Sequence, residues 1–100
     1  MFQLRRTEAF IKWQSGLRDM RAVERIAQRL VRLEYGLFGD AKSIAGKVWE
    51  LRIDYGPGYR VYFMRRGDEI ILLLCGGDKL SQKRDIARAV QMATMIGDEE

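Results

Sequence analysis

Apolar and polar positions follow two different rhythms along this chain, and each rhythm predicts one kind of element. Helices are expected where apolar residues recur at every third or fourth position, and these segments are 8–19, 20–35 and 81–95. Strands are expected where apolar and polar residues alternate or short apolar runs occur, and these segments are 2–7, 47–54, 59–65 and 69–75. The segment 36–47 contains three glycines and is expected to be a mobile loop.

These elements predict an α+β fold in the order β-α-α-β-β-β-α. Thr7 and Ser81 are suited to begin the first and last helices as N-caps, and Gly36 is suited to end the second helix. Gly16 weakens the first helix without ending it. Because the last three strands have short connections, we expect them to form an antiparallel meander whose apolar face the helices cover.

Length and composition narrow the class of protein. With 47% hydrophobic and 32% charged residues, the 100 residues suit one globular domain, expected over 1–96 and followed by a disordered acidic tail, 97–100. The lone Cys75 and the lack of His argue against a disulfide framework and a His/Cys metal site, so no metal or other cofactor is expected, and a reducing cytoplasm fits. The longest apolar run, 70–75, is far too short to cross a membrane.

The charge balance favours an anionic partner. Lys and Arg number 18 against 14 Asp and Glu, a net charge of +4, which suits nucleic acid or an acidic protein segment. On the second predicted helix four arginines fall within a wedge of roughly 80°. They are Arg21, Arg25, Arg29 and Arg32. This stripe is either a solvated face or a surface that follows a phosphate backbone.

The hairpin "ELRIDYGPGYRVYF" at 50–63 has an apolar side and a polar side. Strand alternation places Leu51, Ile53, Val61 and Phe63 on the first side, and Glu50, Arg52, Asp54, Arg60, Tyr62 and Met64 on the second. If the turn is symmetric about Pro57, Arg52 faces Tyr62 and Asp54 faces Arg60 across the ladder. The polar side is expected to be the open face of the sheet.

Two interpretations of this open face follow. It is an anion site, in which Arg52 and Arg60 bind phosphate and Tyr62 stacks on a base or bonds to sugar or phosphate, or it is a wet sheet surface on which Asp54 pairs with Arg60 and Arg52 bonds to Glu50 or Glu69. The segment "GGDKLSQ" at 76–82 bears on the same surface, since its glycines permit unusual backbone angles and close approach. Lys79 could present its ammonium there and carry protons in a chain without His, or the segment is a turn in which Asp78 bonds to the backbone.

Two long segments resemble the RelE/ParE toxin superfamily, in particular the HigB-like addiction module killer proteins. They are 29–63, which includes "WELRIDYGPGYRVYF", and "LLLCGGDKLSQKRDIARA" at 72–89. The resemblance extends to Trp13 and Asp19, and so over nearly the whole chain. It implies a microbial-RNase-like fold, with two N-terminal helices and a C-terminal helix packed on an antiparallel sheet, and a toxin of a type II toxin–antitoxin system.

The resemblance also implies an activity and its residues. Members similar to RelE and HigB cut mRNA at the ribosomal A site, whereas the ParE branch poisons DNA gyrase. Arg60 matches the arginine of the "GYR" motif that binds the scissile phosphate, and Arg52 matches the arginine of "ELR". Nuclease members usually place a Tyr or His near the C-terminal end for acid–base chemistry. This sequence has neither there, so Lys79, or Lys42 and Lys47, are expected to carry protons.

Several partners are implied as well. The cognate antitoxin is expected to be a helix-turn-helix protein, HigA-like, that covers or distorts the cationic face, and the toxin–antitoxin complex is expected to bind its operator DNA. The toxin itself would act on mRNA on the ribosome, in the cytoplasm. The residues expected to contact RNA or the ribosome are Arg21, Arg25, Arg29, Arg32, Lys42, Lys47 and Tyr62. The alternative is a non-enzymatic, ParE-like inhibitor of DNA gyrase.

Overall fold

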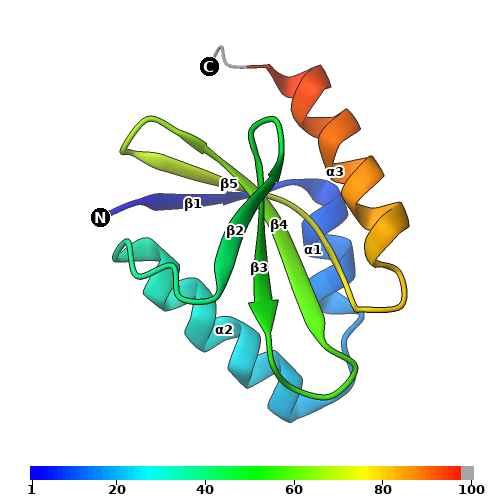
Figure 1. Cartoon of the computed structure of the whole chain (residues 1–100). Coiled ribbons are helices and arrows are strands. Elements are labelled where there is room, and N and C mark those ends of the chain that lie inside the picture. The colour runs from blue at the N-terminus through cyan, green and yellow to red at the C-terminus, as the bar shows by residue number, and fades with distance from the viewer. Residues whose placement is uncertain (98–100) are drawn as a thin grey trace.

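A computed structural model describes residues 1–97 of the chain (Figure 1). The elements are β1 (Gln3–Arg6), α1 (Glu8–Ser15), α2 (Met20–Glu34), β2 (Ala41–Ala45), β3 (Val48–Ile53), β4 (Tyr59–Arg66), β5 (Ile70–Gly77) and α3 (Gln82–Ile96). The predicted α+β, RelE-like class is confirmed. The acidic tail expected at 97–100 lies, after Gly97, outside the described residues.

One strand was not predicted. The segment expected to be a loop contains β2, which pairs antiparallel with β3 so that Ala41 lies opposite Leu51 and Lys42 opposite Glu50. Gly39 and Gly46, at φ +64° and +54°, make the turns at its two ends, and these glycines suggested a loop. With only five residues and few large apolar side chains, β2 has a weak strand signal of its own and is stabilised by its pairing with β3.

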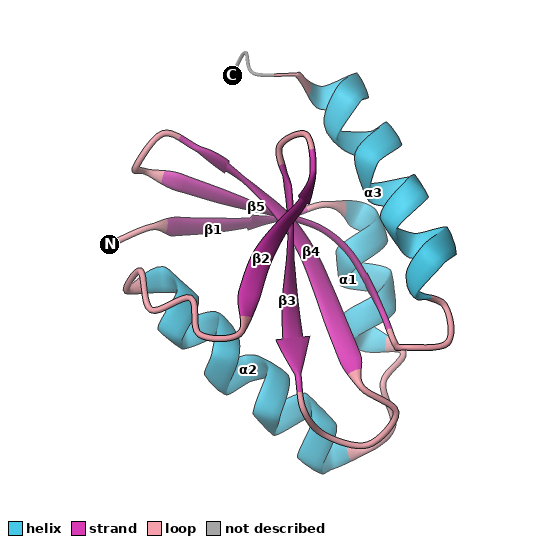
Figure 2. Cartoon of the chain, in the orientation of Figure 1, coloured by secondary structure: helices cyan, strands magenta, loops and turns pink. Residues whose placement is uncertain are grey.

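The five strands form one sheet in the order β1-β5-β4-β3-β2 (Figures 1 and 2). The last four strands form the expected antiparallel meander with β2 added at one edge. At the other edge β1 runs parallel to β5, because α1 and α2 intervene before the chain returns to the sheet. The backbone N–H of Phe2 also donates to the carbonyl of Glu34, which joins β1 to the end of α2.

Helices cover both faces of the sheet, which corrects the expectation of one open face. On one face α1 and α2 pack on the inward side chains of β3, β4 and β5, through Phe10, Ile26, Leu30 and Leu33. On the other face α3 packs on Tyr62, Met64 and Leu74, through Ala89 and its neighbours. Arg52 and Lys42 on this second face are not buried by α3, and Arg52 is partly exposed.

The predicted helix ends are partly right. Thr7 caps α1, since its hydroxyl accepts from the N–H of Phe10 at 3.1 Å, and Gly36 follows α2 at φ +78°. Gly16 does end α1, contrary to expectation, because the chain turns there to start α2 at the N-cap Asp19. Ser81 precedes α3 without a capping hydrogen bond from its side chain. No helix within residues 1–97 is long and apolar enough to cross a membrane.

Candidate anion site

The register of the β3–β4 hairpin places two arginines directly opposite each other. Arg52 pairs with Arg60, so the hairpin is centred on Gly56 and the predicted centre at Pro57 is wrong. Gly56 and Gly58 adopt φ +56° and +79°, which only glycine adopts readily, and this closes the loop after Ile53. Because a shift of two residues leaves every side chain on its own face, the predicted division into two sides still holds.

The three residues predicted to be catalytic meet in one pocket. Arg52, Arg60 and Lys79 line a hollow of about 380 Å³ at the end of the sheet, together with the hairpin loop. The backbone N–H of Lys79 donates to the carbonyl of Pro57 at 3.3 Å, which fixes the segment after β5 beside this loop. Two carboxylates, Asp40 and Asp54, also line the pocket. The catalytic roles of these residues stay predictions.

Arg60 is the most buried of the three cations that line the pocket. Its side chain is 9% exposed, and its Nε is buried without a hydrogen-bond partner among the described residues. The predicted alternative, an Asp54–Arg60 ion pair, is not formed. A buried polar donor without a partner is costly, and the cross-strand neighbour of Arg60 is a second cation, Arg52. The pocket therefore contains a buried arginine donor that the described residues leave unbonded.

A buried carboxylate lies behind the two arginines. Glu50 has no exposed surface and accepts three hydrogen bonds, from Arg52 Nε at 3.0 Å, Tyr62 Oη at 3.1 Å and Gln82 Nε2 at 2.8 Å. Burial raises its pKa, but the three donors and the charge of Arg60 outweigh this and hold the pKa of Glu50 below its ordinary value. Glu50 thus stays ionised and holds Arg52 in place.

Tyr62 cannot stack on a base, so this prediction is wrong. Its ring has no exposed surface, because α3 covers it. Burial, with the nearby charge of Glu50, raises the pKa of the Tyr62 hydroxyl well above its ordinary value, so the phenol is a fixed donor to Glu50. Strand alternation placed Tyr62 beside Arg52 and Arg60 correctly, but it could not show which part of that face a helix covers.

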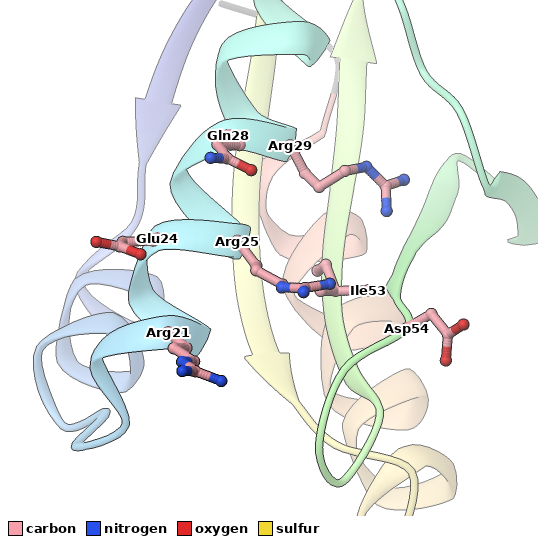
Figure 3. Close-up of a pocket in the computed structure, with 7 residues that line it drawn as sticks. All are labelled: Arg21, Glu24, Arg25, Gln28, Arg29, Ile53 and Asp54. Atoms are coloured by element: carbon pink, nitrogen blue, oxygen red, sulfur yellow. The ribbon is translucent and has the colours of Figure 1, made fainter.

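The arginines of α2 line a second hollow next to the first. Arg21, Arg25 and Arg29 surround a space of about 620 Å³ between α2 and the end of β3, and Figure 3 shows Arg25 and Arg29 extending toward Ile53 while Glu24 points away. Both hollows include Ile53 and Asp54 in their walls. Arg32 lies outside this hollow, on another part of the helix surface.

Arg29 differs from the other arginines of the stripe. Its guanidinium donates to the backbone carbonyls of Arg52, Phe38 and Asp40, and it is half-buried. Burial lowers the pKa of Arg29 from its ordinary value. Because its donors are engaged in joining α2 to β3 and to the loop before β2, Arg29 has a structural role. The prediction that it contacts RNA is not supported by this arrangement.

The remaining predicted residues lie elsewhere. Lys42 is exposed on β2, and Lys47 is exposed in the β2–β3 turn, and neither lines the pocket of Arg60. In the "GGDK" segment Asp78 Oδ1 accepts from the N–H groups of Leu80 and Ser81 at 3.0 and 3.1 Å, as the turn interpretation predicted. Sequence reasoning missed Asp40 as a pocket residue, since it lies in the segment expected to be a loop.

A pocket lined by two arginines and a lysine at the end of an α+β sheet, with a second arginine-lined hollow beside it, defines the class: a small protein with a RelE-like fold. Residues 15–94 match the model of the family described as phage derived protein Gp49-like (DUF891). The chain therefore belongs to the Gp49-like family, a RelE/ParE-like toxin family. It is also 44% identical to an uncharacterized protein of Haemophilus influenzae over 95 aligned residues. The alignment covers 95% of this chain and 96% of that protein.

Proposed function

We propose that this protein is the toxin of a type II toxin–antitoxin system, HigB-like, and that it inhibits translation by cleaving mRNA on the ribosome. The observation that carries the proposal is Arg60, a residue that is nine-tenths buried and whose Nε has no hydrogen-bond partner among the described residues, in a pocket that Arg52 and Lys79 also line. The forked geometry of arginine suits the oxygens of a phosphodiester. Membership of a toxin family supports the same role.

The pocket holds the groups that RNA cleavage without a metal requires. The 2′-oxygen attacks the phosphorus as its proton passes to the Asp54 carboxylate, and the bond from phosphorus to the 5′-oxygen breaks as that oxygen takes a proton from the Lys79 ammonium. The products are a 2′,3′-cyclic phosphate and a 5′-hydroxyl, and water returns the proton from Asp54 to Lys79. Arg52 and Arg60 stabilise the negative charge on the phosphate oxygens.

The ribosome is expected to align the reacting atoms of the mRNA, which the pocket does not do alone. In-line attack requires the 2′-oxygen, the phosphorus and the 5′-oxygen to be aligned, and such positioning accounts for several kcal/mol of a barrier. An exposed lysine and an exposed carboxylate do not impose that alignment alone, so mRNA held in the ribosome is the expected substrate. Exposed cations outside the pocket, such as Arg21, Arg32 and Lys42, are then available for ribosomal RNA.

The expected protein partner is a cognate antitoxin of the helix-turn-helix class, HigA-like. It would neutralise the toxin by covering or distorting the cationic pocket, and the complex would bind operator DNA through the antitoxin. The isolated toxin is expected to arrest growth, and co-expression of the antitoxin is expected to relieve that arrest.

The test is induction of the chain in a bacterium, followed by mapping of mRNA 5′ ends. Codon-phased cleavage is expected, and Arg60→Ala should reduce it about 100-fold or more, because a group that stabilises the transition state is lost. Arg5→Ala is the matched control, since Arg5 is an exposed arginine on β1 and is absent from the pocket lining. Full cleavage by the Arg60→Ala variant would contradict the site assignment.

A second candidate function is non-enzymatic inhibition of DNA gyrase, as in the ParE branch. The lack of His in the chain and of Tyr in the pocket lining favours it, since nuclease members usually use these residues for proton transfer. A supercoiling assay with purified gyrase separates the two. Growth arrest with intact mRNA and inhibited supercoiling would overturn the nuclease and establish this alternative.

A further inference from the structure

Arg25 and Tyr55 form a cation–π pair beside the two arginine-lined hollows. The Cζ atom of Arg25 lies 5.0 Å from the centre of the Tyr55 ring, and Arg25 itself is exposed. Tyr55 directly follows Asp54, which is in the wall of both hollows. The pair therefore lies where the pocket of Arg60 meets the hollow along α2.

The ring beneath Arg25 is fixed from several directions. The hydroxyl of Tyr55 donates to Asp19 Oδ2 at 2.8 Å, and the other oxygen of Asp19 caps α2 by accepting from the N–H groups of Arg21 and Ala22. The ring also packs against the core between α1, α2 and the sheet. Because Tyr55 cannot turn freely, the exposed guanidinium of Arg25 has a fixed ring beneath it.

The charges around Arg25 favour a neutral group over a phosphate. Asp54 lies across the hollow from Arg25, and Asp19 is at the far end of the Tyr55 ring (Figure 3 shows Asp54). These carboxylates reduce the positive potential at Arg25, whereas the buried Nε of Arg60 still has a hydrogen bond to donate. A flat guanidinium with compensated charge suits stacking with a planar group more than it suits binding an anion.

We propose that the guanidinium of Arg25, which lies over the Tyr55 ring, is a stacking platform for one unpaired base of the RNA whose phosphate occupies the Arg60 pocket. The inference rests on the proposed function, because it takes single-stranded RNA as the ligand. Bases of single-stranded RNA stack on aromatic rings and on guanidinium planes, and loss of one such contact weakens binding by roughly tenfold. Arg25 then distinguishes single-stranded nucleic acid from polyanions without bases, by a contact that charge alone does not provide.

The test uses a fluorescently labelled RNA oligomer with 2′-O-methyl groups that prevent cleavage, and a set of the same oligomer with one abasic position each. Binding is measured by fluorescence anisotropy. For the unmodified protein, one abasic position near the phosphate site should weaken binding about tenfold. Arg25→Lys keeps the charge and loses the plane, so it should bind the complete oligomer about tenfold more weakly and lose its sensitivity to that abasic position.

Two further variants complete the design. Tyr55→Leu should behave like Arg25→Lys, while Tyr55→Phe, which keeps the ring, should retain most of the affinity; thermal melting checks that both are folded. The inference would be overturned if Arg25→Lys bound the complete oligomer as tightly as the unmodified protein does. It would also be overturned if both proteins lost the same affinity at the abasic position, or if the unmodified protein did not bind the oligomer. Arg60→Ala tests the phosphate pocket separately: if it alone loses binding, the proposed function stands and the stacking platform fails.

Discussion

Among the single residues of the candidate site, Glu50 has the largest effect on its geometry. Its carboxylate joins β3 to β4 through Tyr62, joins the sheet to α3 through Gln82, and holds Arg52 beside Arg60. Sequence alternation identified the face on which Glu50 lies and the pair with Arg52 as one possibility. It could not reveal the burial of Glu50, because charged residues on strands are usually exposed.

We predict that Glu50→Gln lowers the free energy of unfolding by about 2 kcal/mol at pH 7, because a carboxylate that accepts three hydrogen bonds is lost. The pKa of Glu50 is depressed in the folded protein, so its stabilisation is present above the ordinary value of 4.5 and is lost as the pH falls through the folded-state value. Urea unfolding between pH 8 and pH 3 should show that the difference in free energy of unfolding between Glu50→Gln and the unmodified protein decreases only at acid pH.

The matched control is Glu69→Gln, which neutralises an exposed carboxylate at the start of β5. It should change the stability little at any pH. If the gap between Glu50→Gln and the unmodified protein were the same at pH 3 as at pH 7, the ionised carboxylate would not be the source of the stabilisation.

Cys75 should be almost unreactive in the folded protein. It is buried under α3, and burial, with the nearby Asp85 carboxylate, raises the pKa of its thiol to about 11. Since the thiolate is the reactive form, iodoacetamide at pH 8 should modify the native chain far more slowly than the chain in concentrated urea. Mass spectrometry after timed quenching measures both rates. Equal rates would show that the strand end and α3 open readily.

At the scale of elements, a close approach between helices and β5 explains the two glycines at the end of that strand. Neither Gly76 nor Gly77 has positive φ, so the unusual backbone angles that the pair suggested are absent. A Cβ on Gly76 would lie 2.3 Å from Trp13, and one on Gly77 would lie 1.8 Å from the carboxylate of Asp85. The glycines therefore let α1 and α3 pack closely on the strand that leads to Lys79.

Gly76→Ala is expected to lower the free energy of unfolding by about 1–3 kcal/mol, because the indole of Trp13 must move. Gly16→Ala makes the same change at the end of α1, where the nearest atoms would be 3.5 Å away and φ is ordinary, so it should be neutral or slightly stabilising. Urea unfolding followed by tryptophan fluorescence compares them. Equal stability of the two variants would contradict the close packing.

The elements also show what periodicity can and cannot predict. Long amphipathic segments such as α2 and α3, and the strands with strong apolar runs, were located nearly to the residue. The short β2 was missed because its stability comes from pairing with β3, which is not a local property. The parallel partner of β1 and the placement of α3 on the opposite face depend on the path of the whole chain, which local spacing does not contain.

Over the molecule as a whole, basic side chains from three parts of the chain line two neighbouring hollows. Arg52 and Arg60 come from the hairpin, Lys79 from the segment before α3, and Arg21 and Arg25 from α2. Binding of RNA along these hollows should release counterions, so the affinity should fall as salt rises. With four phosphate contacts, the logarithm of affinity is expected to fall about 3 units per unit of log salt.

The arginines of α2 should separate into two kinds in such a measurement, although each carries the same charge on the same helix. Arg21→Ala should leave the melting temperature unchanged and reduce the salt slope for the cleavage-resistant RNA oligomer by about 0.7, because one exposed phosphate contact is lost. Arg29→Ala should instead lower the free energy of unfolding by about 2 kcal/mol, because backbone carbonyls of Arg52 and Phe38 lose their donor. Salt titrations by anisotropy and urea unfolding of both variants measure the two effects. A loss of salt slope with unchanged stability in Arg29→Ala would show that this guanidinium leaves its carbonyl partners to bind RNA, and the division of the helix into binding and structural arginines would be wrong.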